Sequence, residues 1–89
     1  MRIVWTAAAR RDRRSAITYL SDLNPVAAIR LEEALVLAAD SLSTFPYRGR
    51  PGLVGGTREL ATVPPYLLIY EVQKDLVCIL RIWHAARDR

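Results

Sequence analysis

Two apolar runs near the C-terminal end of the chain constrain its fold more than any other feature. Tyr66–Val72 is apolar except for Glu71, and Leu76–Trp83 is interrupted in polarity only by Arg81. The turn sequence Gln73-Lys74-Asp75 separates the two runs, which predicts two strands joined in a hairpin. Strands that are apolar on both faces lie centrally in a sheet or are covered on both sides. The rest of the chain must therefore supply flanking strands and a covering layer.

Two helices joined by a short turn are predicted upstream of these strands. Thr6 is placed to cap a helix from Ala7 to about Ser21, whose apolar residues recur near helical spacing. Asn24-Pro25 begins a second helix that continues to about Thr44, because Asn caps well and Pro suits the first helical position. Two helices connected by so few residues form an antiparallel hairpin.

Two further strands complete the predicted fold. Arg2–Trp5 and Thr57–Val63 have the β-branched and apolar character of strands, and Pro64-Pro65 ends the second one. The Gly- and Pro-rich segment Arg48–Gly56 is predicted to be a loop. The order strand, helix, helix, strand, strand, strand predicts an α+β fold with the helical hairpin on one face of a small, mainly antiparallel sheet. At 89 residues, the chain forms a single domain over residues 1–89.

Composition excludes several classes of protein. Apolar residues make up 52% of the chain and charged residues 25%, which is typical of a globular protein and not of a disordered one. Cys78 is the only cysteine and His84 the only histidine, so neither a disulfide framework nor a structural zinc site with its usual four or so ligands is available. Apolar runs are too short for a membrane span or a signal peptide. We therefore expect a cytoplasmic protein with no metal, no cofactor and no membrane partner.

Arginine dominates the charge of the chain. The net charge is +4, and among 13 basic residues the one lysine is Lys74. The planar fork of arginine suits phosphate and carboxylate groups, so we expect an anionic partner, either nucleic acid or an acidic protein segment. Arg48 and Arg50 in the predicted loop, together with Arg87 and Arg89 after the last strand, are the candidate contacts with that partner.

Several polar residues in or beside the predicted strands need an interpretation. His84 follows the last strand as a possible general acid or base, but packing on the neighbouring tryptophan is the favoured interpretation, since acid–base work needs a partner group. Arg81 lies in an apolar strand, and a buried arginine requires a carboxylate, which Glu59 or Glu71 on neighbouring strands is predicted to supply. This internal ion pair is favoured over a contact between Arg81 and a substrate. Arg58 and Glu59 are themselves a candidate cross-strand pair.

Groups of short motifs span nearly the whole chain. In order they are Trp5-Thr6-x-x-Ala9, Asn24-Pro25 with Ala27-Ala28, Leu42 with Phe45-Pro46, Gly49-Arg50-Pro51-Gly52, Gly56-Thr57-Arg58-Glu59-Leu60, Pro65-Tyr66 with Ile69-Tyr70, and Ile79-Leu80-Arg81-Ile82 with His84-Ala85-x-Arg87. In this order and spacing the chain resembles the RelE/ParE superfamily of toxins from bacterial type II toxin–antitoxin systems. The fold of that superfamily is strand, two helices and three strands, which agrees with the pattern predicted above.

The resemblance implies one of two toxic activities. RelE-like members enter the ribosomal A site and cleave mRNA with basic residues and, in some members, an acid–base side chain, whereas ParE-like members inhibit DNA gyrase. Leu67 stands where the ribonucleases carry a catalytic arginine, while Arg58, Arg87 and His84 match or lie near their other positions. Because phosphoryl transfer depends on oriented cations, the missing arginine favours the ParE-like branch, a gyrase inhibitor that blocks replication.

Two alternatives to gyrase inhibition stay open. One is a ribosome-dependent mRNA endoribonuclease that uses Arg58, Arg87 and His84, and the other is a non-toxic homologue that acts with its antitoxin at operator DNA. The resemblance also implies growth inhibition, plasmid stabilization and a cognate antitoxin bound in a heterotetramer or larger complex, with operator DNA contacted only through the antitoxin. The predicted elements carry more apolar surface than a small core buries, which suits an antitoxin segment added as a helix or a strand.

Overall fold

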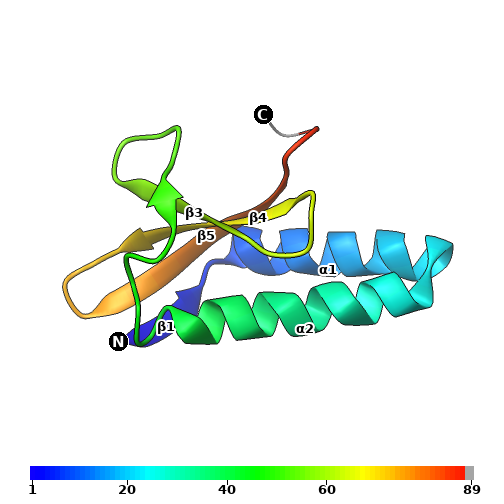
Figure 1. The fold of residues 1–89 in the computed structure, drawn as a ribbon, viewed down its shortest axis with the longest axis horizontal. Coiled ribbons are helices and arrows are strands. Elements are labelled where there is room, and N and C mark those ends of the chain that lie inside the picture. Colours follow the sequence, from blue (N-terminus) through cyan, green and yellow to red (C-terminus); the bar gives the residue numbers. More distant parts are fainter. Residues whose placement is uncertain (88–89) are drawn as a thin grey trace.

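The computed structural model describes residues 1–87, and its elements follow the predicted order with one addition (Figure 1). The elements are β1 (Arg2–Trp5), α1 (Ala7–Leu23), α2 (Pro25–Ser41), β2 (Arg50–Pro51), β3 (Thr57–Ala61), β4 (Tyr66–Val72) and β5 (Leu76–His84). The predicted α+β class and the helical hairpin are confirmed. Some element ends differ from the prediction by one to three residues, because the last turn of a helix and the last residues of a strand have weak local signals.

The five strands form one sheet in the order β1-β5-β4-β3-β2. β1 runs parallel to β5, with Trp5 opposite Ile79, and the other neighbouring pairs are antiparallel. The two apolar runs therefore form interior strands, β4 and β5, as the sequence predicts. Leu80 is an extra residue on β5, since Ile79 and Arg81 face consecutive residues of β4. This β-bulge changes the direction of the side chains that follow it.

β2 is the strand that the sequence analysis missed, because its segment was predicted to be a loop. Arg50 pairs with Glu59 and Pro51 with Arg58, which places β2 at the edge of the sheet beside β3. A proline is tolerated there because an edge strand has one side without strand partners. The segment is anchored just before β2, where the Gly49 amide donates to the Tyr70 hydroxyl at 2.8 Å.

One face of the sheet packs against the helical hairpin and forms the core with it (Figure 1). The largest fully buried side chains come from α2, the residue just after it, β4 and β5: Tyr70, Leu31, Leu35, Leu42, Leu68, Ile79 and Val77. Both predicted helix caps are confirmed. The Thr6 hydroxyl accepts from the Ala9 amide at 3.0 Å, and the Asn24 side chain accepts from the Ala27 amide at 3.2 Å.

The turn end of the hairpin projects past the sheet (Figure 1), and several apolar side chains of the hairpin are exposed. Leu23, Val26 and Ile29 are 66%, 62% and 61% exposed, and Leu37 on the outer side of α2 is 70% exposed. An exposed group of large apolar side chains is typical of a protein–protein contact surface. Within residues 1–87, no helix is long and apolar enough to cross a membrane.

Candidate functional site

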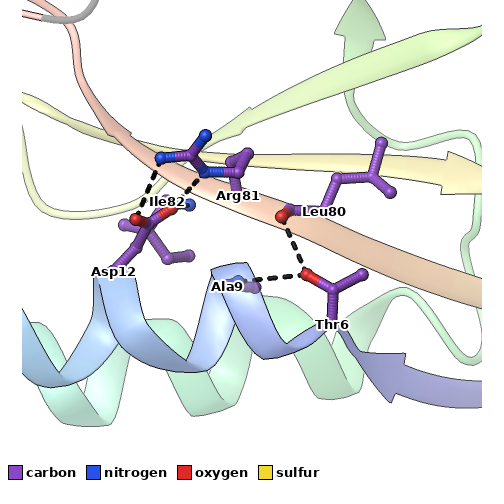
Figure 2. Close-up of polar contacts among 6 residues, drawn as sticks. All are labelled: Thr6, Ala9, Asp12, Leu80, Arg81 and Ile82. Carbon is purple, nitrogen blue, oxygen red and sulfur yellow. Dashed lines mark hydrogen bonds and ion pairs between the residues drawn. The ribbon is translucent and has the colours of Figure 1, made fainter.

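β5 continues beyond its parallel partner β1, and α1 takes over the outer edge of the strand (Figure 2). The Thr6 amide donates to the Ile79 carbonyl at 3.0 Å, and the Thr6 hydroxyl donates to the Leu80 carbonyl at 2.9 Å. Farther along α1, the Asp12 carboxylate accepts from the Ile82 amide at 3.0 Å. Side chains of the helix thus replace the hydrogen bonds that a longer β1 would make, which fixes α1 against the end of β5.

Arg81 pairs with Asp12 of α1, whereas the sequence predicted Glu59 or Glu71 as its carboxylate. Its Nε and Nη2 atoms donate to the two carboxylate oxygens of Asp12 at 2.7 and 3.1 Å (Figure 2). The prediction assumed a regular strand with a buried arginine. Instead, the bulge at Leu80 redirects the following side chains, and the Arg81 side chain is 50% exposed and reaches the helix.

A cleft of about 400 Å³ opens beside this ion pair, between α1 and the adjoining ends of β4 and β5. We refer to it as the α1–β5 cleft. Its lining side chains come from α1, the first residue of β4, the end of β5 and one residue of the segment after β5: Asp12, Ser15, Ala16, Tyr19, Tyr66, Arg81, Ile82, His84 and Arg87. The cleft therefore gathers one carboxylate, two guanidinium groups, three hydroxyls and the only imidazole of the chain.

His84 packs against Tyr66 in this cleft. The sequence had predicted that it packs against Trp83. The two rings meet edge to face, with centroids 5.4 Å apart and planes at 84°. Tyr66 and His84 are direct cross-strand partners and share one face of the sheet, whereas consecutive residues on a strand point to opposite faces. A ring at position 83 therefore lies on the other side from His84.

Arg87 lies at the mouth of the cleft and is exposed. Its amide donates to the His84 carbonyl at 3.0 Å, and its guanidinium lies over the Tyr19 ring, 5.9 Å from the centroid. Its role as a contact with a partner stays a prediction. Arg89 lies outside the described residues.

The other predicted arginines lie at the opposite end of the sheet, around β2 and β3. Arg50 forms an ion pair with Glu59 at 3.1 Å, and the Glu59 side chain is 1% exposed. Arg58 donates to the Gly49 carbonyl at 2.6 Å and lies over the Tyr47 ring, 5.0 Å from its centroid. The predicted Arg58–Glu59 pair is therefore wrong, because neighbours on one strand face opposite sides.

Arg48 precedes β2 and is the last of the predicted partner contacts. Its Nη1 atom donates to the Ser41 hydroxyl at 2.8 Å, and the residue is exposed. Arg48 and Arg50 thus present charge to solvent while each makes one contact that positions it.

The residues proposed for a ribonuclease are not brought together. Arg58 is opposite Tyr70 on β4, whereas His84 is opposite Tyr66 on the same strand. Four residues of strand separate those positions by about 13 Å, at about 3.3 Å per residue. Leu67, at the position of the catalytic arginine of the ribonucleases, is buried and lies on the sheet face opposite to Tyr66. Only His84 and Arg87 share a site.

Four further residues that line the cleft were not predicted as site residues: Asp12, Ser15, Tyr19 and Tyr66. The first three recur at three- and four-residue steps and therefore lie on one face of a helix, which the sequence alone reveals. That this face meets the end of β5 is a tertiary contact, and no local pattern predicts it.

Neither a metal site nor an activated thiol is present within residues 1–87. No group of three or more His, Cys, Asp and Glu side chains in this range is placed to hold a metal ion. Burial raises the pKa of the Cys78 thiol, and the nearby Glu71 carboxylate raises it further. A raised pKa keeps the thiol protonated at neutral pH, whereas a nucleophilic cysteine needs a lowered one.

An ion pair joins the two helices of the hairpin. Arg13 of α1 binds Glu32 of α2, and its guanidinium also lies over the Trp5 ring, 4.9 Å from the centroid. The hydrogen bond that Arg13 donates to the Glu32 carboxylate raises the pKa of Arg13, so this arginine stays charged. The contact joins β1, α1 and α2 at one point.

Comparison with known proteins gives a consistent family. The model of the family described as "ParE toxin of type II toxin-antitoxin system, parDE" matches residues 3–89. Toxin RelE2 of Caulobacter vibrioides is 46% identical over 86 residues, which cover 96% of each chain. Y4kP of Sinorhizobium fredii is 38% identical over 85 residues, covering 94% of this chain and 88% of its own.

A solved structure agrees with the sequence relatives. A chain of the chromosomal ParDE toxin–antitoxin system from P. aeruginosa superposes with a TM-score of 0.82 at 26% identity, covering 94% of this chain and 95% of that chain. The match of fold, order of elements and sequence extends over almost the whole length. The chain therefore belongs to the ParE toxin family of type II toxin–antitoxin systems, within the RelE/ParE superfamily.

Proposed function

We propose that this toxin inhibits DNA gyrase and is not a ribonuclease. The observation that carries the proposal is the separation of Arg58 from His84 and Arg87, together with a buried leucine at the position of the catalytic arginine. Cleavage of a phosphodiester needs cations and an acid–base group around one phosphate. Arg58 instead binds the Gly49 carbonyl and stacks on Tyr47, which gives it a structural role.

A second candidate function is ribosome-dependent cleavage of mRNA. Two relatives from Caulobacter vibrioides carry the name RelE, and His84 and Arg87 lie in one cleft. This alternative requires a catalytic set that omits Arg58.

Purified toxin is expected to reduce supercoiling by purified gyrase in a dose-dependent way and to leave translated mRNA intact. We also expect the Leu67→Arg variant to leave mRNA intact, because one added cation does not bring Arg58 to the cleft. Supercoiling assays and primer extension on translated message measure the two activities. Toxin that is premixed with its antitoxin serves as the control for both.

Reproducible cuts in the ribosomal A site by the wild-type protein would overturn the proposal in favour of the ribonuclease. Absence of both effects would identify a non-toxic homologue that acts with its antitoxin at operator DNA.

A cognate antitoxin is the partner that the family implies, and the exposed apolar side chains support a large contact with it. Those on Leu23, Val26, Ile29 and Leu37 of the hairpin are each more than 60% exposed, so the chain's own core does not cover them. We propose a heterotetramer or larger complex in which the antitoxin covers this surface and alone contacts operator DNA. Arg48, Arg50 and Arg87, with Arg89 beyond the described residues, are the proposed ionic contacts with the antitoxin or the target.

Arg87→Ala is expected to weaken antitoxin binding or toxicity while changing stability by less than about 0.5 kcal/mol. Arg87 is exposed, and its contacts lie at the rim of the cleft. Loss of a hydrogen-bonded ion pair at an interface costs about 2–5 kcal/mol of affinity. Thermal melts, antitoxin titrations and growth-arrest assays on the same variant measure the separate effects. A melting temperature far below that of the wild type would instead identify Arg87 as a structural residue.

A further inference from the structure

We propose that a surface around Tyr47 is the contact by which this toxin binds its protein target, and that this contact is separate from the one made with the antitoxin. The surface is formed by the segment between α2 and β2 and by β2 with the turn that follows it. We refer to it as the Tyr47 surface, and its exposed members are Phe45, Tyr47, Arg48, Arg50, Leu53 and Val54. The inference rests on the proposed function for the identity of the target, gyrase. It adds the chemistry that the surface accepts, which is an acidic protein segment with apolar anchor residues.

Large apolar side chains of the Tyr47 surface are mostly exposed. Phe45 and Tyr47 are each 64% exposed, and Leu53 and Val54 in the turn after β2 are 69% and 61% exposed. Aromatic residues are enriched at the centres of protein–protein contacts, where a few of them supply most of the affinity. The aliphatic side chains of Leu53 and Val54 offer no ring on which a base could stack. The composition therefore favours a protein partner over a nucleic acid.

Tyr47 is a common wall of two hollows in this surface. The first, of about 470 Å³, is lined by residues 44–48. The second, of about 290 Å³, is lined by Tyr47, Pro51, Gly56, Thr57, Arg58 and Val72. Neither lining includes a carboxylate, and each includes an arginine, which is Arg48 in the first and Arg58 in the second. Two hollows that share one wall can receive two anchor side chains of a single polypeptide segment.

Tyr47 is fixed in place before any partner binds. The guanidinium of Arg58 lies over its ring, 5.0 Å from the centroid, and donates to the Gly49 carbonyl at 2.6 Å. The turn that carries the ring is closed by the Arg48 amide, which donates to the Phe45 carbonyl at 3.1 Å. A side chain that is already ordered loses less conformational entropy when a partner binds, so more of its contact energy appears as affinity.

The charge of this region favours an acidic partner. Residues 44–59 contain three arginines and one carboxylate, that of Glu59. Glu59 is buried and pairs with Arg50, whose side chain nevertheless stays 66% exposed. Arg48 is exposed, and its hydrogen bond goes to a neutral hydroxyl. Positive charge around apolar anchors selects a segment that carries acidic residues, and it also speeds the encounter with that segment.

The Tyr47 surface lies at the end of the molecule opposite to the turn between α1 and α2 (Figure 1). Leu23 and Val26, which belong to the surface proposed for the antitoxin, lie at that turn. The molecule extends 39 Å along its longest axis and exposes 5423 Å² of surface. A contact of standard size covers about 800 Å² of each partner, so there is room for two. Two exposed apolar groups at opposite ends match the two protein partners of a toxin, its target and its antitoxin.

The test compares variants of the full-length toxin in supercoiling by purified gyrase, in growth arrest and in titration with the antitoxin. Tyr47→Ala is expected to raise the toxin concentration for half-inhibition of gyrase about tenfold or more, because a central aromatic contact carries that much affinity. Growth arrest at matched expression is expected to weaken with it, while antitoxin affinity stays within about twofold. Because Tyr47 is exposed, we expect the melting temperature to stay within about 3 °C of the wild type.

Three further variants separate the contributions of the ring and the charge. Tyr47→Phe keeps the ring and is expected to inhibit gyrase within about threefold of the wild type. Arg48→Gln is expected to weaken inhibition about threefold to tenfold and to make it less sensitive to salt, since a charge at the rim of a contact acts mainly on the encounter. Arg30→Gln is the matched control for charge, because Arg30 is exposed on α2 and lies outside the Tyr47 surface. We expect it to stay within about twofold of the wild type.

Phe45→Ala is a second variant that leaves the contact between Arg58 and Tyr47 intact. It removes an exposed ring that lines the first hollow, and it is expected to weaken gyrase inhibition without weakening antitoxin binding. It therefore decides the question if Tyr47→Ala melts well below the wild type.

Three results would overturn the Tyr47 surface as the target contact. The first is growth arrest and gyrase inhibition at wild-type strength by both Tyr47→Ala and Phe45→Ala. The second is an equal loss of antitoxin binding in these variants, which would assign the surface to the antitoxin. The third is saturable binding of a short single-stranded RNA that Tyr47→Ala abolishes while gyrase inhibition is unchanged.

Failure of this inference and failure of the proposed function give different results. If wild-type toxin leaves gyrase active while Tyr47→Ala still loses growth arrest, the surface stands and the target is a protein other than gyrase. If wild type and both variants inhibit gyrase equally, the proposed function stands and the surface does not.

Discussion

Gly49→Ala is expected to lower the free energy of unfolding by about 2–4 kcal/mol and the melting temperature by roughly 10 °C or more. A Cβ atom at this position would lie 2.7 Å from the Glu59 carbonyl oxygen and 2.8 Å from the Tyr70 hydroxyl. Tyr70 is fully buried, and its hydroxyl accepts the hydrogen bond from the Gly49 amide. The added methyl group must therefore displace either the strand β3 or the buried ring.

Gly55→Ala is the matched control for this steric effect. No atom lies within 4 Å of a Cβ built on Gly55, so we expect its stability to change by less than about 0.5 kcal/mol. Chemical denaturation with urea measures both variants. If the Gly49→Ala variant is as stable as the wild type, the close approach of Gly49, Glu59 and Tyr70 is not a constraint on the fold. Because Gly49 precedes β2, we also expect this variant to lose the fixed position of Arg50.

Asp12→Ala is expected to destabilise the protein by about 2–3 kcal/mol, more than removal of its ionic partner Arg81. The carboxylate of Asp12 accepts from the Ile82 amide as well as from Arg81 (Figure 2). Ile82 is 5% exposed, so its amide cannot recover a full hydrogen bond from water. An unsatisfied buried amide costs about 1–3 kcal/mol, and loss of the ion pair adds to that cost.

Arg81→Ala is the control that separates the two contributions. It removes a half-exposed ion pair and leaves the bond between Asp12 and the Ile82 amide, so we expect a loss of about 0.2–1 kcal/mol. Asp12→Asn keeps an acceptor oxygen and is expected to fall between the two. Equal destabilisation by Asp12→Ala and Arg81→Ala in urea denaturation would show that the ion pair, and not the strand-edge hydrogen bond, carries the effect.

Local patterns in the sequence predict most of the secondary structure and the family. Thr6 and the Asn24-Pro25 pair mark the starts of both helices, because capping depends on residues three positions apart or fewer. The apolar runs of β4 and β5 predict interior strands, because these strands are apolar on both faces. Motif order along the chain predicts the superfamily, which the family match over residues 3–89 confirms.

Ionic pairing in the sheet could not be predicted from the same patterns. Arg81 pairs with Asp12, which is 69 positions away, and the bulge at Leu80 directs the side chain toward α1. Glu59 binds Arg50 because β2 joins the sheet there, although the segment has the composition of a loop. Strand register and bulges decide which face a side chain occupies, and a shift of one residue exchanges the faces.

The sequence by itself determined the helices, the interior strands, the arginine-rich charge and the toxin family of this protein. Only the tertiary structure decided that His84 and Arg87 share a cleft with three hydroxyls of α1 and β4, while Arg58 lies at the other end of the sheet. The physical reason is that helix capping and hydrophobic periodicity act between near neighbours in the chain, whereas a site is built where distant segments meet. Their meeting depends on the whole core, in which the hairpin packs on one face of the sheet and α1 completes the edge of β5.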